Sequence, residues 1–123
     1  MIAGLALIAV VTLGLASRSA ALRSVPVLGH TFGDGAWAAA AYCGIRLLAP
    51  RASVRATALT AIVVAFGVEC SQLWRPEWLE SLRAEPLVAL LIGRGFLWQD
   101  LAAYVVGVAV IASLDGLRRR NRA

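Results

Sequence analysis

Four apolar segments divide this chain and restrict what it can fold into. They cover residues 2–16, 31–49, 54–73 and 95–114. With 60% hydrophobic and only 15% charged residues, the chain has too little polar surface to cover the core of a soluble domain of 123 residues. We therefore expect a single domain, residues 1–123, that is all-α and polytopic, with four transmembrane helices.

The first of these segments is the shortest. As a helix its fifteen residues extend over roughly 22 Å, against a hydrocarbon core of about 30 Å. A cleaved signal peptide is the alternative, because small residues follow the apolar run. No arginine or lysine precedes the run, however, and a signal peptide begins with positive residues. The pattern favours a short or tilted first crossing.

A shorter apolar run precedes the last segment. Residues 86–93 follow a polar stretch and are too few to cross a membrane. We expect this run to form a short interfacial or re-entrant helix, or to lead into the fourth crossing.

The positive charge is spread along the chain in a way that indicates membrane topology. Twelve basic residues against seven acidic ones give a net charge of +5, but the arginines lie between the apolar segments and in the C-terminal tail. This distribution argues against a nucleic-acid partner and indicates contact with anionic lipid. Four crossings place seven arginines on the side of both termini and five on the other side, which favours cytoplasmic termini.

Polar residues in and beside the apolar segments are the best indication of function. A carboxylate at the centre of a transmembrane helix costs roughly 2.5–3.5 kcal/mol on insertion scales, and it usually faces protein or a water-filled cavity. The predicted topology brings the polar ends of several segments to one membrane face. The candidate cluster there consists of Arg18, Asp34, Glu69, Gln72, Arg83, Asp100 and Tyr104.

Structural roles stay open for the same residues. Asp34 and Asp100 lie near the starts of predicted helices, where a carboxylate also caps free N–H groups. Tyr104 could belong to an interfacial aromatic belt. Glu69 could form a buried ion pair with an arginine such as Arg83, and so fix helix packing without binding anything.

Small residues and cysteines complete the pattern. Small side chains recur at four-residue spacing in the second segment, which permits close helix packing and a homo-oligomer; they are Gly35, Ala39 and Cys43, and Ala36, Ala40 and Gly44. Cys43 and Cys70 are expected to be buried apolar side chains. His30 is the only histidine, so a site with several histidine ligands is excluded, and we expect no metal or cofactor.

Several short motifs resemble those of a known family. In chain order they are Gly14-Leu-Ala-Ser-Arg18, Gly33-Asp34-Gly-Ala-Trp37, Glu69-Cys-Ser-Gln72-Leu, Leu82-Arg83, and Gly93-Arg-Gly-Phe-Leu-Trp-Gln-Asp100-Leu-Ala-Ala-Tyr104. This series resembles the domain-of-unknown-function 2809 family of small bacterial integral membrane proteins. The resemblance implies a four-helix domain in the bacterial cytoplasmic membrane, and it brings no established activity.

A looser similarity is to the VanZ-like family. That family's pattern has an acid and a glutamine late in one helix, then an arginine, then an aspartate opening the last helix. Glu69, Gln72, Arg83 and Asp100 follow this order, whereas the asparagine that often follows the aspartate is absent and Tyr104 stands nearby. Because the prototype is associated with low-level glycopeptide resistance, the similarity implies a role at the cell envelope.

These observations support functions from different classes. The polar cluster could bind an envelope-related or lipid headgroup ligand. Alternatively, the chain is a structural or accessory membrane subunit whose buried ion pairs only fix helix packing. An intramembrane enzyme acting on a lipid-linked substrate is less favoured, because no HExxH, P-loop or GxSxG motif occurs and no nucleophile is paired with a base.

Overall fold

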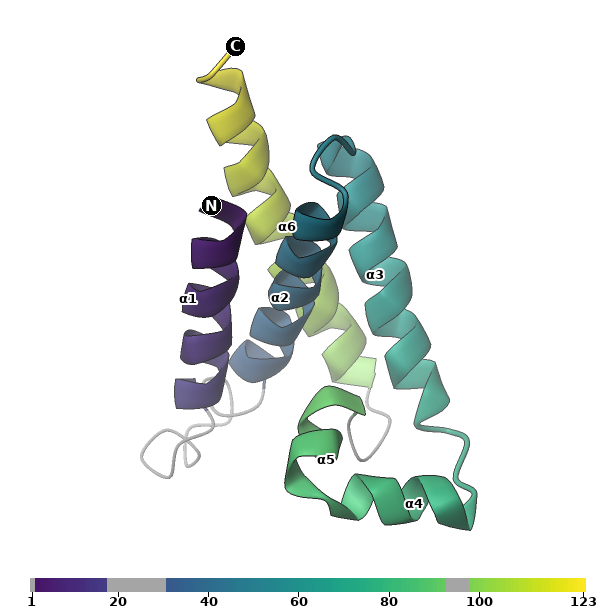
Figure 1. The fold of residues 1–123 in the computed structure, drawn as a ribbon. Helices are drawn as coiled ribbons and strands as arrows, with labels where there is room; N and C mark the ends of the chain where they lie inside the picture. The colour runs from purple at the N-terminus through teal and green to yellow at the C-terminus, as the bar shows by residue number, and fades with distance from the viewer. Residues whose placement is uncertain (1, 18–30, 93–97) are drawn as a thin grey trace.

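The computed structural model describes residues 2–17, 31–92 and 98–123 (Figure 1). Within these residues the regular secondary structure is helical, which confirms the all-α prediction. The helices are α1 (Ile2–Ser17), α2 (Phe32–Leu48), α3 (Val54–Ser71), α4 (Glu77–Ala84), α5 (Pro86–Ile92) and α6 (Trp98–Arg120).

The four longer helices form a bundle with α2 at its centre. Helix α2 packs against α1, α3 and α6, and α3 also packs against α6. Successive long helices run in opposite directions, and α4 and α5 lie together at one end (Figure 1). We call this the α4–α5 end. The start of α1, the connection from α2 to α3 and the end of α6 lie toward the opposite end, which we call the termini end.

Two helices among the described residues, α3 and α6, are long and apolar enough to cross a membrane. Helix α1 is apolar but has 16 residues, and α2 has 17. At about 1.5 Å per residue they extend over roughly 24 and 26 Å, less than the hydrocarbon core of about 30 Å. The four predicted helices therefore exist, but four membrane crossings are not confirmed.

The predicted boundaries hold within two residues for the first three segments, and the fourth differs more. Helix α6 continues past residue 114 to Arg120, with Arg118, Arg119 and Arg120 in its last turn. Arginine forms helices well, and positive charges stabilise the negative end of the helix dipole, so the arginine tail extends the helix. The predicted start at residues 95–97 lies outside the described residues.

The stretch between the third and fourth segments forms two short helices. The predicted short helix is α5, which begins with Pro86, a residue suited to the first helical turn. The polar stretch before it, for which we predicted no helix, is α4. Glu77 and Glu80 in its first turn and Arg83 in its last complement the helix dipole. An interfacial or re-entrant position of α5 in the membrane stays a prediction.

Small residues bring α2 into close contact with two of its long neighbours, α1 and α6. A Cβ added at Gly107 of α6 would lie 2.7 Å from the carbonyl carbon of Gly35 in α2. On the other side of α2, a Cβ added at Gly14 of α1 would lie 3.1 Å from the Cβ of Ala36. The prediction of close packing through small residues holds at Gly35 and Ala36, whereas a Cβ at Gly44 would meet nothing within 4 Å. At these two contacts the small residues serve helices of the same chain, and a homo-oligomer stays a prediction.

The two cysteines differ in their surroundings. Cys43 is buried in the core between α2 and its neighbours, as predicted. The same prediction for Cys70 was wrong, since its side chain is exposed. Cys70 follows Glu69 by one residue, or about 100° around the helix, so it cannot share the inward face of α3 on which Glu69 lies.

Candidate functional site

The carboxylate of Glu69 is completely enclosed by protein. Glu69 lies near the end of α3, on the same face as Ala61 and Ala65, and all three residues are 0% exposed. Their spacing of four residues places them in one stripe along the helix. The stripe faces the bundle interior, so Glu69 does not point to lipid or to water.

Two of the predicted cluster residues contact this carboxylate directly. Oε2 of Glu69 accepts a hydrogen bond of 2.8 Å from the hydroxyl of Tyr104 and one of 3.1 Å from Nε2 of Gln72. Tyr104 comes from α6, whereas Gln72 is the C-cap residue of α3. We call these three residues the Glu69 network. It joins the end of α3 to the first part of α6.

The two aspartates of the predicted cluster lie around this network. Asp34 is in the first turn of α2 and Asp100 in the first turn of α6, and both are partly buried. Both are close enough for their charges to act on the Tyr104 hydroxyl. The ring of Trp37 packs against that of Tyr104, with centroids 5.8 Å apart. Arg18 lies outside the described residues.

Arg83 has a different role from the predicted ion pair with a transmembrane carboxylate. Its Nη1 donates to the carbonyl oxygen of Trp74 at 3.1 Å, and its Nη2 to that of Ser71 at 3.0 Å. Nη1 also pairs with Glu80 at 2.8 Å, one helical turn earlier in α4. The hydrogen bonds from Arg83 and then Arg75 lower the pKa of Glu80. Arg83 thus caps the end of α3 and holds α4 against it.

Two polar atoms at this corner have no hydrogen-bond partner among the described residues. They are Oε1 of Gln72, a residue that is only 4% exposed, and Nε of Arg83, a residue that is only 3% exposed. A buried polar atom without a partner costs about 1–3 kcal/mol. Arg83 contacts the carbonyl of Ser71, which directly precedes Gln72. The end of α3 therefore has one acceptor, the Gln72 oxygen, and one donor, the Arg83 Nε group, without a hydrogen-bond partner among the described residues.

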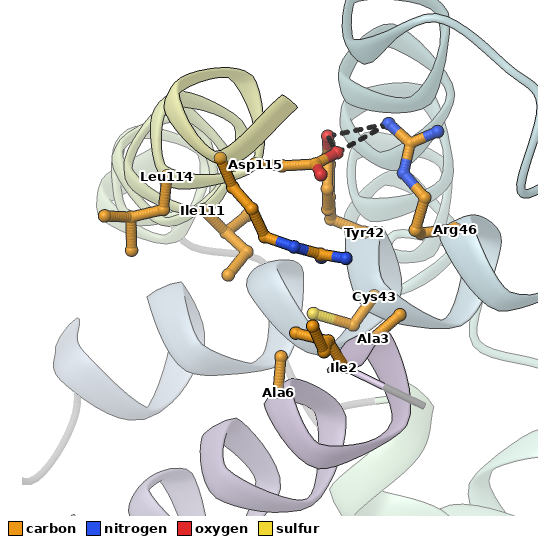
Figure 2. Close-up of a pocket in the computed structure, with 10 residues that line it drawn as sticks. Ile2, Ala3, Ala6, Tyr42, Cys43, Arg46, Ile111, Leu114 and Asp115 are labelled. Carbon is orange, nitrogen blue, oxygen red and sulfur yellow. Dashed lines mark hydrogen bonds and ion pairs between the residues drawn. The ribbon is translucent and has the colours of Figure 1, made fainter. Parts of the chain in front are cut away.

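The termini end contains a second polar network, which sequence reasoning missed. Oδ2 of Asp115 accepts a hydrogen bond of 2.6 Å from the Tyr42 hydroxyl and pairs with Nη2 of Arg46 at 2.7 Å (Figure 2). Its Oδ1 lies 3.5 Å from Nε of Arg119. Arg46 also donates to the carbonyl oxygen of Ala52 at 2.6 Å. We call Tyr42, Arg46, Asp115 and Arg119 the Asp115 network.

This network shows that arginines of the termini end, which the sequence indicates only as topology signals, also form ion pairs within the protein. Arg46 is only 7% exposed, so its charge lies inside the protein rather than on a solvated face. A signal was present in the sequence, since Tyr42 and Arg46, like Asp115 and Arg119, are four residues apart and so share a helix face. Their pairing across α2 and α6 depends on the tertiary fold.

In the described ranges, no group of three or more His, Cys, Asp or Glu side chains is arranged to hold a metal ion. The contacts within the two networks are hydrogen bonds and ion pairs. Ser71, the hydroxyl nearest to Glu69 in sequence, donates to the carbonyl oxygen of Val68 in its own helix at 2.6 Å. This engages the hydroxyl proton within α3.

Comparison with known proteins gives one family. The family model described as "Protein of unknown function (DUF2809)" matches residues 24–108, more than half of the chain. This match includes Asp34, Arg83 and all three residues of the Glu69 network. No solved structure matches the chain. The looser VanZ-like similarity stays a prediction.

Proposed function

We propose a function for this chain, which belongs to the DUF2809 family of proteins of unknown function. It is a multi-pass protein of the bacterial cytoplasmic membrane, and it binds a lipid headgroup at its α4–α5 end. The exposed side chains support the membrane placement. Leu5 and Ile8 of α1 and Val63 of α3 are each more than half exposed, as are many other large apolar residues of the bundle. Such surfaces are stable in lipid and costly in water.

The short helices fit this proposal if the bilayer adapts to them. A hydrophobic helix shorter than the membrane core is accommodated by local thinning or by residues that reach to the interface, at a modest cost. The excess of arginine at the termini end favours a cytoplasmic position for that end. The α4–α5 end, with the Glu69 network, then lies at the outer face.

The unmet oxygen of Gln72 is the observation that carries the ligand proposal. Oε1 of Gln72 is buried and needs a hydrogen-bond donor, and the neighbouring Nε of Arg83 needs an acceptor. A phosphodiester headgroup with an ammonium or hydroxyl group supplies both. Phosphatidylethanolamine and phosphatidylglycerol are headgroups of this kind. Phosphatidylcholine has the phosphate but no N–H or O–H donor, so it satisfies only Arg83.

A purely structural role is the second candidate, and one contact favours it. The hydrogen bond from Tyr104 to Glu69 joins α6 to α3 whether or not a ligand is present. If the network only fixes helix packing, the protein has no preference among headgroups. An intramembrane enzyme has less support, because the Ser71 hydroxyl is engaged by its own helix.

Lipid-dependent stability separates these candidates. We would measure the unfolding temperature of the purified protein in phosphatidylcholine micelles with added phosphatidylethanolamine, phosphatidylglycerol or more phosphatidylcholine. A bound headgroup at a hundredfold excess over Kd stabilises the folded state by about 2.7 kcal/mol. We expect stabilisation by the first two lipids and none by the third.

Three variants then assign the effect to the Gln72 oxygen. Gln72→Met removes the acceptor and should abolish the headgroup preference. Gln99→Met makes the same change at an exposed residue of α6 and should retain it. Tyr104→Phe disturbs the Glu69 network but leaves the Gln72 oxygen in place, so the preference should persist. If the wild type shows no preference among the lipid headgroups, or if Gln72→Met retains the preference, the structural role is supported instead.

A further inference from the structure

A cleft of about 180 Å³ lies at the termini end, far from the Glu69 network in the bundle. It is enclosed by the start of α1, the second half of α2 and the last part of α6 (Figure 2). The apolar part of its lining consists of Ile2, Ala3, Ala6, Ile111 and Leu114, together with Cys43. Its polar part consists of Tyr42, Arg46, Asp115 and Arg118.

The polar part of this cleft has spare hydrogen-bond donors. Nε of Arg46 and Nε of Arg118 are both buried, and neither has a hydrogen-bond partner in the described part of the chain. Asp115 does not meet this demand, because Oδ2 is occupied by Tyr42 and Arg46 and Oδ1 faces Arg119. What the two Nε groups require is a further acceptor.

The charge at the cleft is also unbalanced. Among the residues that line it, Arg46 and Arg118 bring two positive charges against the single negative charge of Asp115. Arg119 lies outside the lining and also pairs with Asp115, so positive charge is in excess around the cleft. An anion is the ligand that matches both this excess and the unmet N–H donors. The apolar residues next to these donors offer no polar contact to a hydration shell. A fully hydrated ion therefore does not match the cleft.

We propose that this cleft binds the phosphate group of an anionic membrane lipid, with the acyl chains leaving along the exposed apolar surface of α6. The cleft is smaller than the roughly 300–1,000 Å³ of pockets that enclose a whole drug-sized ligand. It therefore admits a headgroup and not a complete lipid. Leu114 lines the cleft and is itself more than half exposed, so it provides a continuous apolar path from the cleft to the bilayer.

This inference uses the membrane placement proposed above, but not the headgroup site at Gln72. The two sites lie at opposite ends of the bundle and differ in chemistry. The Gln72 corner needs both a hydrogen-bond donor and an acceptor in its ligand, whereas the cleft needs only acceptors with negative charge. Substitutions at Gln72 should leave lipid binding at the cleft unchanged, so failure of one proposal is distinguishable from failure of the other.

Binding of defined lipids to the full chain tests the proposal. The protein in detergent would be titrated with phosphatidylglycerol, with phosphatidylcholine and with inorganic phosphate, and retained ligands counted by native mass spectrometry. The Gln72→Met background removes the headgroup preference of the other site. We expect one phosphatidylglycerol to be retained preferentially over phosphatidylcholine, and inorganic phosphate not to compete at millimolar concentration. Equal retention of the two lipids, or competition by phosphate alone, would overturn the proposal.

A matched pair of variants separates the cleft from the arginine tail. Arg118→Gln removes a charge that lines the cleft, and Arg120→Gln removes one from the exposed tail. Loss of a charged hydrogen bond should weaken phosphatidylglycerol binding about tenfold or more in Arg118→Gln, with less than about a twofold effect in Arg120→Gln. Equal losses would mean general attraction of lipid to the tail. Should Arg118→Gln not fold, Arg118→Lys keeps the charge without the Nε donor and should also weaken binding.

Discussion

The contact between α2 and α6 predicts a large difference between two glycines of the same helix. Gly107 of α6 faces Gly35, and a Cβ there would lie 2.7 Å from its carbonyl carbon and 2.8 Å from its Cα. Carbon atoms pack at about 3.5–4.0 Å, so Gly107→Ala forces the two backbones apart by about 1 Å. Gly116 is the control, because a Cβ there meets nothing within 4 Å.

The expected free energies follow from these distances. Overpacking costs about 1–3 kcal/mol, and we place Gly107→Ala toward the upper end because backbone atoms cannot rotate away as side chains can. Replacing glycine by alanine in a helix returns about 0.5–1 kcal/mol at both positions. We therefore expect Gly107→Ala to lower the free energy of unfolding by about 1–2 kcal/mol. Gly116→Ala should raise it slightly.

Cys43 provides the assay. It is 3% exposed in the core, so a thiol-reactive fluorescent dye reaches it only on unfolding. Exposed Cys70 would be replaced by serine in every variant. The unfolding temperature should shift by about 2–8 °C for each kcal/mol. Gly35→Ala should fall between the two variants, because its Cβ would lie 3.2 Å from the carbonyl oxygen of Ala103. Equal unfolding temperatures for Gly107→Ala and Gly116→Ala would refute the close approach.

Three further predictions concern the polar contacts. Tyr104→Phe removes a hydrogen bond to buried Glu69 and should lower stability by about 1–2 kcal/mol, measured with the same dye. Asp115→Ala leaves Arg46 buried without its carboxylate and should cost about 3–5 kcal/mol; Asp115→Glu, which keeps the charge, should cost clearly less. Because the pKa of Glu80 is lowered in the folded protein, its ion pairs stabilise the α3–α4 corner above the carboxyl's ordinary pKa. That contribution should disappear as the pH falls through the lowered pKa, whereas Glu80→Gln should show no such loss in tryptophan fluorescence.

Local spacing explains which side chains can meet in the Glu69 network, although the sequence predicted only a wider cluster. Glu69 and Gln72 are three residues apart and so share a helix face, and the small residues preceding Glu69 mark that face as buried. Tyr104 belongs to a similar stripe on α6, with Ala103 and Gly107. Each helix thus carries its own evidence of which face is buried, and antiparallel order brings the two faces to the same end of the bundle.

The contacts that sequence reasoning missed depend on elements far apart in the chain. No local pattern joins Asp115 to its partner Tyr42, because the two residues are 73 positions apart. Arg83 was expected to pair with a transmembrane carboxylate, since α4 was not predicted. Once α4 folds, Glu80 lies one turn away and the carbonyls at the end of α3 are within reach. Local geometry then determines the partner of Arg83.

The Asp115 network has a consequence for how the chain is made. The carboxylate that neutralises Arg46 lies in α6, 73 residues after Tyr42. At about 5–20 residues per second it is synthesised roughly 4–15 s after Tyr42. During this interval the guanidinium of Arg46 lacks this carboxylate and must be solvated by other groups. Biosynthesis therefore passes through an intermediate in which Arg46 is not neutralised by Asp115, and a nascent chain that stops before α6 keeps it in that state.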